Sequence, residues 1–75
     1  MKRKTGTVEW FDSWGEIKSD KGELIWFSYY TLDPTNEQNP VAGDRVSFYR
    51  VADDYRRYDG TKTKWKYKAI MVKLI

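Results

Sequence analysis

Apolar and polar residues alternate along most of this chain with a period of two, the pattern of a β-strand that has one face in a core. The first three runs with this pattern span residues 5–11, 14–18 and 23–27. Turn-forming residues separate them, first Asp12 and Ser13 and then Asp20, Lys21 and Gly22. We therefore predict three consecutive antiparallel strands, with Gly22 adopting a positive φ in the second turn.

The same alternation assigns the side chains of these strands to two faces. In the second run, Trp14, Glu16 and Lys18 fall on one face. The positions that we assign to the core are Val8, Phe11, Ile17, Ile25 and Phe27. This assignment leaves Trp26 exposed beside Trp14 and Lys18, so the sequence predicts an outer face that carries both aromatic and basic side chains.

Residues 28–43 form the least regular part of the sequence. This segment contains Pro34, Pro40 and a run of polar turn formers between them, which excludes a long helix. Residues 28–32 are compatible with a single 3₁₀ turn. We predict a loop here that crosses from one edge of the sheet to another.

Two further strands are predicted in the second half of the chain. Residues 45–51 alternate, with Val46 and Phe48 on one face. Residues 62–75 predict a long fifth strand, of which residues 69–75 are apolar enough to enter the core. Five strands without a predicted helix favour a small all-β barrel, because closing the sheet removes the exposed edges of a short chain.

Length and composition favour a single domain and argue against an enzyme. The 75 residues form one domain, 1–75, which buries only a little over about 60% of the surface of its unfolded chain. The chain has no cysteine, which excludes disulfides and thiolate zinc sites, and no histidine, the commonest metal ligand and acid–base group. We therefore expect no catalysis, no metal and no other cofactor.

Charge and hydropathy indicate which partners and which cellular location to expect. The net charge of +3 and the pI near 9.2 are compatible with binding to a polyanion. No apolar run is long enough to span a membrane, and the basic residues 1–4 are not followed by the apolar region of a signal peptide. We expect a cytoplasmic protein without a membrane partner.

Aromatic residues make up 17% of the chain, and a domain of this size does not bury all thirteen large rings. Lysines occupy every second position through residues 62–68, with Trp65 and Tyr67 among the residues between them. Arg56 and Arg57 add positive charge in the preceding loop. Exposed rings beside cations suit a single-stranded nucleic acid, whose bases stack on the rings while its phosphates meet the cations.

Short motifs at four places in the chain resemble those of a known family. GTVEWFD at residues 6–12 is similar to the motif G-x-V-K-W-F-N, and IWFS at 25–28 to V-H-F-S. AGDRVSF at 42–48 is similar to E-G-Q-x-V-x-F, and Gly15 and Ile17 match two positions of K-G-F/Y-G-F-I. In this order the motifs resemble those of the cold-shock domain. The resemblance implies an OB-fold, a five-stranded antiparallel Greek-key barrel that binds single-stranded DNA or RNA.

The departures from the family pattern fall on the face that binds nucleic acid. Glu9 stands in place of a lysine and Glu16 in place of an aromatic residue. Leu24 replaces a phenylalanine, and Trp26 replaces a stacking histidine. We therefore expect Glu9 and Glu16 to repel phosphate and to weaken the site without abolishing it.

The resemblance implies that Trp10, Trp14 and Trp26 stack on bases, together with Phe27 or Tyr30. The cations of the predicted fifth strand and of the loop before it then replace the charge that the family pattern has lost. The complete candidate site comprises Trp10, Trp14, Lys18, Trp26, Phe27, Tyr30, Arg56, Arg57, Lys62, Lys64, Trp65 and Lys66.

Each of these groups also has a purely structural explanation. Tryptophans at the edge of a small core complete its packing, and lysines protect an edge strand from aggregation. Arg56 and Arg57 lie close in sequence to Asp53, Asp54 and Asp59, so ion pairs within the loop compete with phosphate contacts. The alternative function is a protein-interaction module, an inhibitor or adaptor, because the same residue types are favoured at protein interfaces. A lysine-guarded edge favours a monomer, whereas exposed tryptophans favour a partner.

Overall fold

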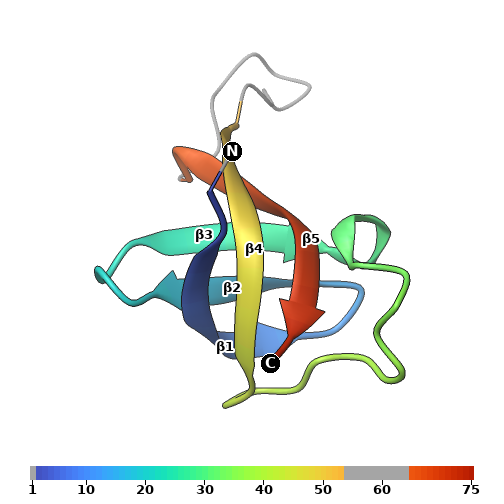
Figure 1. The fold of residues 1–75 in the computed structure, drawn as a ribbon. Helices are drawn as coiled ribbons and strands as arrows, with labels where there is room; N and C mark the ends of the chain where they lie inside the picture. Colours follow the sequence, from blue (N-terminus) through green and yellow to red (C-terminus); the bar gives the residue numbers. More distant parts are fainter. Residues whose placement is uncertain (1, 54–64) are drawn as a thin grey trace, which may run out of the picture.

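The computed structural model describes residues 2–53 and 65–75 and shows an all-β molecule whose strands close into a barrel (Figure 1). The elements are β1 (Lys4–Phe11), β2 (Trp14–Ser19), β3 (Leu24–Ser28), the 3₁₀ turn η1 (Tyr29–Thr31), β4 (Arg45–Ala52) and β5 (Tyr67–Leu74). In the part of the chain that the structure describes, no helix is long and apolar enough to cross a membrane. The closed all-β barrel predicted from the sequence is confirmed.

The first four predicted strands and the 3₁₀ turn are confirmed within one or two residues at their ends. The prediction for the fifth strand is wrong at Trp65 and Lys66, because β5 begins at Tyr67. Trp65 and Lys66 precede the strand, and the Trp65 indole bonds to a side chain of β2 instead of following the ladder with β4. Lys62 and Lys64 lie outside the described residues.

The strand order around the barrel is β1-β2-β3-β5-β4, and β4 closes it by pairing with β1. Every pair is antiparallel except β3 and β5, which are parallel where Trp26 faces Lys68. The expectation of a purely antiparallel barrel is therefore wrong. In a closed ring with an odd number of strands, at least one neighbouring pair has to run in the same direction, and here the long connection from β3 to β4 allows that pair to be β3 and β5.

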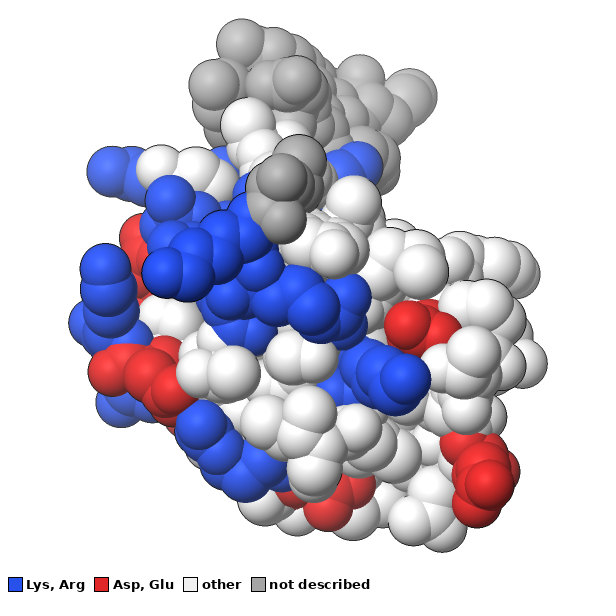
Figure 2. Space-filling view, viewed as in Figure 1, with Lys and Arg blue, Asp and Glu red and all other residues white. Residues whose placement is uncertain are grey.

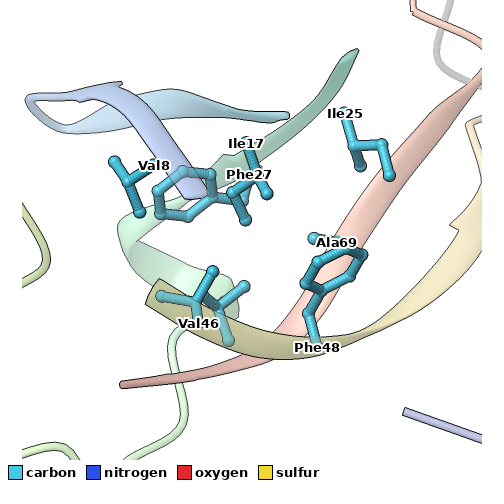
Figure 3. Packing of buried hydrophobic residues seen from close by; sticks show 8 residues of the cluster. Val8, Ile17, Ile25, Phe27, Val46, Phe48 and Ala69 are labelled. Atoms are coloured by element: carbon cyan, nitrogen blue, oxygen red, sulfur yellow. The ribbon is translucent and has the colours of Figure 1, made fainter. Parts of the chain in front are cut away.

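Side chains from all five strands fill the barrel with one apolar core (Figure 3). The buried members are Val8, Ile17, Ile25, Phe27, Val46, Phe48, Ala69 and Val72. Phe11 packs against this core and stacks on Phe27 with a centroid separation of 5.1 Å. The inward positions predicted by the alternation of β1 to β4 are thus confirmed.

The end of the chain is less buried than its composition predicts. Met71 and Ile75 are exposed, because the pairing of β4 with β5 shifts register here and Met71 has a positive φ of 50°. Arg3 reaches across this irregularity. Its guanidinium donates hydrogen bonds to the carbonyls of Met71, at 2.6 Å, and of Ser47, at 3.0 Å, and it lies 4.7 Å from the ring centre of Tyr49. Arg3 thereby provides a hydrogen-bond donor for the Met71 carbonyl at the register shift.

A charged contact ties the turn between β2 and β3 to two other strands. Arg45 of β4 donates two hydrogen bonds to Asp20, at 2.7 and 3.0 Å, and the Thr5 hydroxyl of β1 donates a third. Gly22 completes this turn with a φ of 90°, as its position in the sequence predicts. The Arg45 and Thr5 hydrogen bonds lower the pKa of the Asp20 carboxyl from 3.8 to about 2.

We predict that Asp20→Asn reduces the dependence of thermal stability on acid pH. A carboxyl with a lowered pKa stabilises the folded state above its unfolded value near 3.8, and this contribution is lost as the pH falls toward about 2. The melting temperature of the wild type should therefore fall more steeply than that of the variant between about pH 5 and about pH 2. Circular dichroism melts measure this difference, with Glu37→Gln, an exposed residue of the β3–β4 loop, as the control. Equal pH profiles for the wild type and Asp20→Asn would contradict the assignment.

Candidate nucleic-acid interface

A row of outward-facing residues crosses four adjacent strands of the barrel. Trp10 of β1 is the register partner of Glu16 of β2, Glu16 is the partner of Trp26 of β3, and Trp26 is the partner of Lys68 of β5. These residues face outward because the residues next to them in the strands, such as Ile17, enter the core. Directly opposed residues in a sheet have Cβ atoms about 5 Å apart. The row therefore places the Glu16 carboxylate between one indole on β1, Trp10, and one on β3, Trp26.

Glu16 is only 8% exposed although it lies on the outer face of β2. Its Oε1 accepts a hydrogen bond from Nε1 of Trp10, and its Oε2 accepts one from Nε1 of Trp65, both at 2.7 Å. The carboxylate therefore joins an indole of β1 to an indole that precedes β5. Because a buried charge is costly unless it is hydrogen-bonded, these two contacts stabilise Glu16 in a place where an isolated carboxylate would not be tolerated.

The four tryptophans of the chain form one contiguous group, which we call the indole cluster: Trp10, Trp14, Trp26 and Trp65. Trp14 makes edge-to-face contacts with Trp10 and Trp65, at centroid distances of 4.5 and 5.3 Å. Trp26 and Trp65 lie 6.4 Å apart with tilted rings. Edge-to-face pairs at these distances are favourable and fix ring orientation, so the cluster is a preformed surface.

Carboxylate oxygens accept hydrogen bonds from the N–H groups of three of the four indoles in the cluster. In addition to the two bonds to Glu16, Nε1 of Trp26 donates to Oδ2 of Asp53 at 2.7 Å, and Asp53 is itself buried. Three indole N–H groups therefore point toward acidic side chains of the protein. Trp14 is the most exposed member, at 38%, while the other three indoles are partly buried. The surface that the cluster offers to a ligand consists mainly of ring carbon.

Local backbone features bring Trp10 over Glu16. The pairing of β1 with β2 shifts register between Val8 and Trp10, which leaves Glu9 as an additional residue in β1. At Gly15, a Cβ atom would lie 2.2 Å from the carbonyl oxygen of Trp10. Only glycine permits this close approach of the two strands, so Gly15 helps to place the Trp10 indole above the carboxylate.

The structure brings together four of the predicted site residues and separates others. Trp10, Trp14, Trp26 and Trp65 form the cluster. Lys18 and Lys66 are exposed, and Lys18 follows Glu16 on the outer face of β2. Tyr30 projects from η1 and is 93% exposed. The remaining predicted cations, Arg56, Arg57, Lys62 and Lys64, lie outside the residues that the structure describes.

One expectation about an individual residue is wrong, and another stays a prediction. Phe27 was expected as a possible stacking residue, but it has no exposed surface, because its ring fills the barrel between Phe11 and the other core side chains. The expectation that Glu16 repels phosphate stays a prediction, to which the structure adds that both carboxylate oxygens accept indole hydrogen bonds and that the residue is buried. Glu9 is exposed and remains a negative charge on this side of the barrel.

Sequence reasoning missed the pairing of acidic residues with indoles. For Glu16 a signal was present, since the alternation of β2 places this carboxylate on the same outward face as Trp14. For Asp53 there was no local signal, because its partner, Trp26, is 27 positions away in the sequence. Indole N–H groups are obligate donors, and several of them on one face call for acceptors on the same face.

Basic side chains of the described residues are divided between two regions of the surface. Figure 2 shows lysine and arginine gathered on the face formed by β1, β4 and β5. Arg3 and Arg45 belong to this face, where they bond to Ser47 and Asp20. Two lysines lie at the indole row itself, Lys18 of β2 and Lys68 of β5.

No protein-family model matches this chain, and no curated protein matches it in sequence. The likeness to the cold-shock domain rests on the short motifs at residues 6–12, 25–28 and 42–48. Among residues 2–53 and 65–75, no three acidic, histidine or cysteine side chains are arranged to hold a metal ion.

We predict that Glu16→Gln destabilises the fold by about 1–3 kcal/mol. A glutamine side chain has a single acceptor oxygen, so one of the two indole N–H groups loses its partner and faces an NH₂ group. Urea unfolding followed by circular dichroism measures the change in the free energy of unfolding. The matched control is Glu9→Gln on the neighbouring strand, where an exposed carboxylate should change stability by less than about 0.5 kcal/mol. Equal stabilities of the two variants would show that the carboxylate does not support the indoles.

Proposed function

We propose that this chain binds single-stranded nucleic acid, with unpaired bases stacking on the indole cluster. The observation that carries the proposal is that the four indoles lie together on the outer side of the barrel, while carboxylates hold three of their N–H groups. Ring surface of this kind attracts the flat faces of bases and offers few hydrogen-bond donors to read their edges. Binding of low sequence specificity follows.

The arrangement of the barrel supports a family likeness to the cold-shock domain. OB-folds are small five-stranded barrels that bind oligonucleotides on the face of their second and third strands and with the loops that follow strands one and four. Here Trp14 belongs to β2 and Trp26 to β3. The connection from β4 to β5 contains Arg56, Arg57, Lys62 and Lys64 in the sequence. The positions of the indoles and of these cations in the sequence therefore favour the same mode of binding.

Phosphate groups would meet lysines at the border of the cluster. Lys68 is the register partner of Trp26, and Lys18 lies two residues beyond Glu16 on the same face of β2. Because Glu16 is buried beneath the indoles with both oxygens bonded, its charge is less accessible to a phosphate than the sequence alone suggests. Each stacked base contributes about 1–3 kcal/mol, so two or three bases with a few phosphate contacts support micromolar affinity.

Trp14→Ala is expected to weaken the binding of a short oligothymidine about tenfold, because Trp14 is the most exposed indole. This variant is preferable to Trp26→Ala, which would also remove an indole donor from the buried Asp53. Fluorescence anisotropy with a labelled oligonucleotide measures the affinity. Val41→Ala is the control, because Val41 is an exposed apolar residue of the β3–β4 loop, outside the indole row.

Two results would count against the proposal. If the folded wild type does not bind the oligonucleotide at about 50 mM salt, nucleic-acid binding is wrong, because phosphate contacts are strongest at low salt. The contiguous cluster would then favour the alternative of a protein-interaction module, since tryptophans in one patch are typical of interface hot spots. If Trp14→Ala and Val41→Ala both bind as the wild type does, nucleic acid binds elsewhere on the molecule.

A further inference from the structure

A charged pocket lies beside the start of β1 and the turn between β2 and β3. It has a volume of about 240 Å³, and the buried core residue Ile25 is part of its lining. Four cations and two carboxylates also line it: Arg3, Lys4, Lys21, Arg50, Asp20 and Glu23. Pockets for drug-sized ligands usually measure about 300–1,000 Å³, so this one is of a size for a single compact chemical group.

The strand registers direct two of these cations toward the inside of the barrel. Lys4 of β1 is the register partner of Phe48, and Arg50 of β4 is the partner of Ala69, both of which are core residues. Paired residues of a sheet point to the same face, so Lys4 and Arg50 take the inward direction that apolar residues take farther along the strands. The core therefore ends under a charged layer here, and the mouth of a β-barrel is a common place for a ligand to bind.

Arg50 is fixed in the pocket from two sides. Its Nη1 donates to Oε1 of Glu23 at 2.6 Å, and its guanidinium carbon lies 4.2 Å from the ring centre of Tyr67. The N–H of Glu23 in turn donates to the Ser19 hydroxyl at 3.0 Å. A guanidinium has five N–H donors, so Arg50 keeps donors for an anion in addition to the one that Glu23 accepts. Its orientation is set before a ligand binds, which lowers the entropy cost of binding.

Positive charge is in excess in the pocket. Its cations outnumber its carboxylates by two, and Asp20 already accepts two hydrogen bonds from Arg45, which is not among the lining residues. Among residues 2–53 and 65–75, the side chains of Lys4 and Lys21 take part in no hydrogen bond or ion pair, although Lys4 is half-buried. Since a charge that is partly removed from water is stabilised by a charged hydrogen-bond partner, the pocket favours an anion.

We propose that this pocket binds the dianion of a phosphate monoester, carried by a small molecule or by the end of a strand. The charge of the ligand equals the excess of cations, and its three terminal oxygens accept hydrogen bonds from Lys4, Lys21 and Arg50. A carboxylate or a phosphodiester brings a single negative charge and therefore binds more weakly. The inference goes beyond the proposed function, because the pocket contains no member of the indole cluster.

Titration of the isotope-labelled chain with methyl phosphate, followed by NMR, tests the site. The titration is made at about pH 7.5, where a phosphate monoester carries nearly two charges, and sodium chloride keeps the ionic strength constant. The amide resonances of residues 4–5 and 19–25 should shift and reach saturation. Dimethyl phosphate and acetate, which each carry one charge, should bind at least about tenfold more weakly, because each loses a charge-assisted hydrogen bond.

Two lysine variants locate the site. Lys21→Gln should weaken the binding of methyl phosphate about tenfold, and because Lys21 is an exposed turn residue the fold should be retained. Lys4→Gln, which removes a cation from the inward layer, should have a similar effect. Lys73→Gln is the matched control, because it removes the same charge from an exposed residue of β5 outside the pocket and should bind methyl phosphate as the wild type does.

The site is wrong if methyl phosphate shifts no amide of the pocket, or if Lys4→Gln and Lys21→Gln both bind it as Lys73→Gln does. Equal affinities for methyl phosphate and dimethyl phosphate would overturn the assignment to a monoester.

Oligothymidines with and without a 5′-phosphate separate the two sources of the ligand. If only the phosphorylated form displaces methyl phosphate, the ligand is the end of a strand, and if neither form displaces it, the ligand is a small phosphorylated molecule. Displacement by the form without a terminal phosphate would show that the pocket accepts phosphodiesters and would overturn the monoester assignment. The proposed function is tested by Trp14→Ala, so either proposal fails without the other.

Discussion

The outer face of the barrel depends on one buried carboxylate. Glu16 lies between two strands that carry indoles, and each of its oxygens accepts an N–H from a different indole, Trp10 or Trp65. These donors are 55 positions apart in the sequence: Trp10 lies in the first strand, and Trp65 lies just before the last strand. A buried carboxylate that lost its donors would be strongly unfavourable, so the three side chains stabilise one another. Glu16 thereby couples the start of β5 to the β1–β2 ladder.

The core of this protein follows closely from its sequence, whereas the outer face does not. Strand alternation identified Val8, Ile17 and Phe48 as inward because each side chain in a short barrel has only two directions to take. The role of Glu16 depended on burial, which in turn depends on Trp65, a residue outside any strand. A charged residue in an alternating pattern is assigned to solvent by default, and only the three-dimensional meeting of distant residues reverses this. For Phe27 the strand alternation was the better guide. It assigned this residue to the core, whereas the family likeness implied a stacking role on the surface.

The ends of the barrel were also beyond the reach of sequence patterns. Lysines at every second position predicted a strand that includes Trp65 and Lys66, but regular pairing begins only at Tyr67, although the Lys66 carbonyl still accepts a hydrogen bond from the Asp53 N–H at 3.0 Å. The exposure of Met71 follows from a shift in register, which depends on how β4 and β5 meet rather than on hydropathy. Arg3 bonds to the backbone at this shift, and nothing in the basic sequence at the N-terminus distinguishes it from its neighbours Lys2 and Lys4.

The indole cluster determines which form of nucleic acid the proposed function concerns. The basic face shown in Figure 2 has its arginines bonded within the protein, as Arg45 is to Asp20 and Arg3 to Ser47. Affinity that came mainly from such a face would not distinguish single from double strands, because both present phosphates. Indoles fixed by edge-to-face contacts and carboxylates act differently, since they stack only on bases whose faces are free. Under the proposed function, the preformed aromatic surface therefore favours unpaired bases, and the carboxylates of Glu16 and Asp53 hold the indoles of that surface in place.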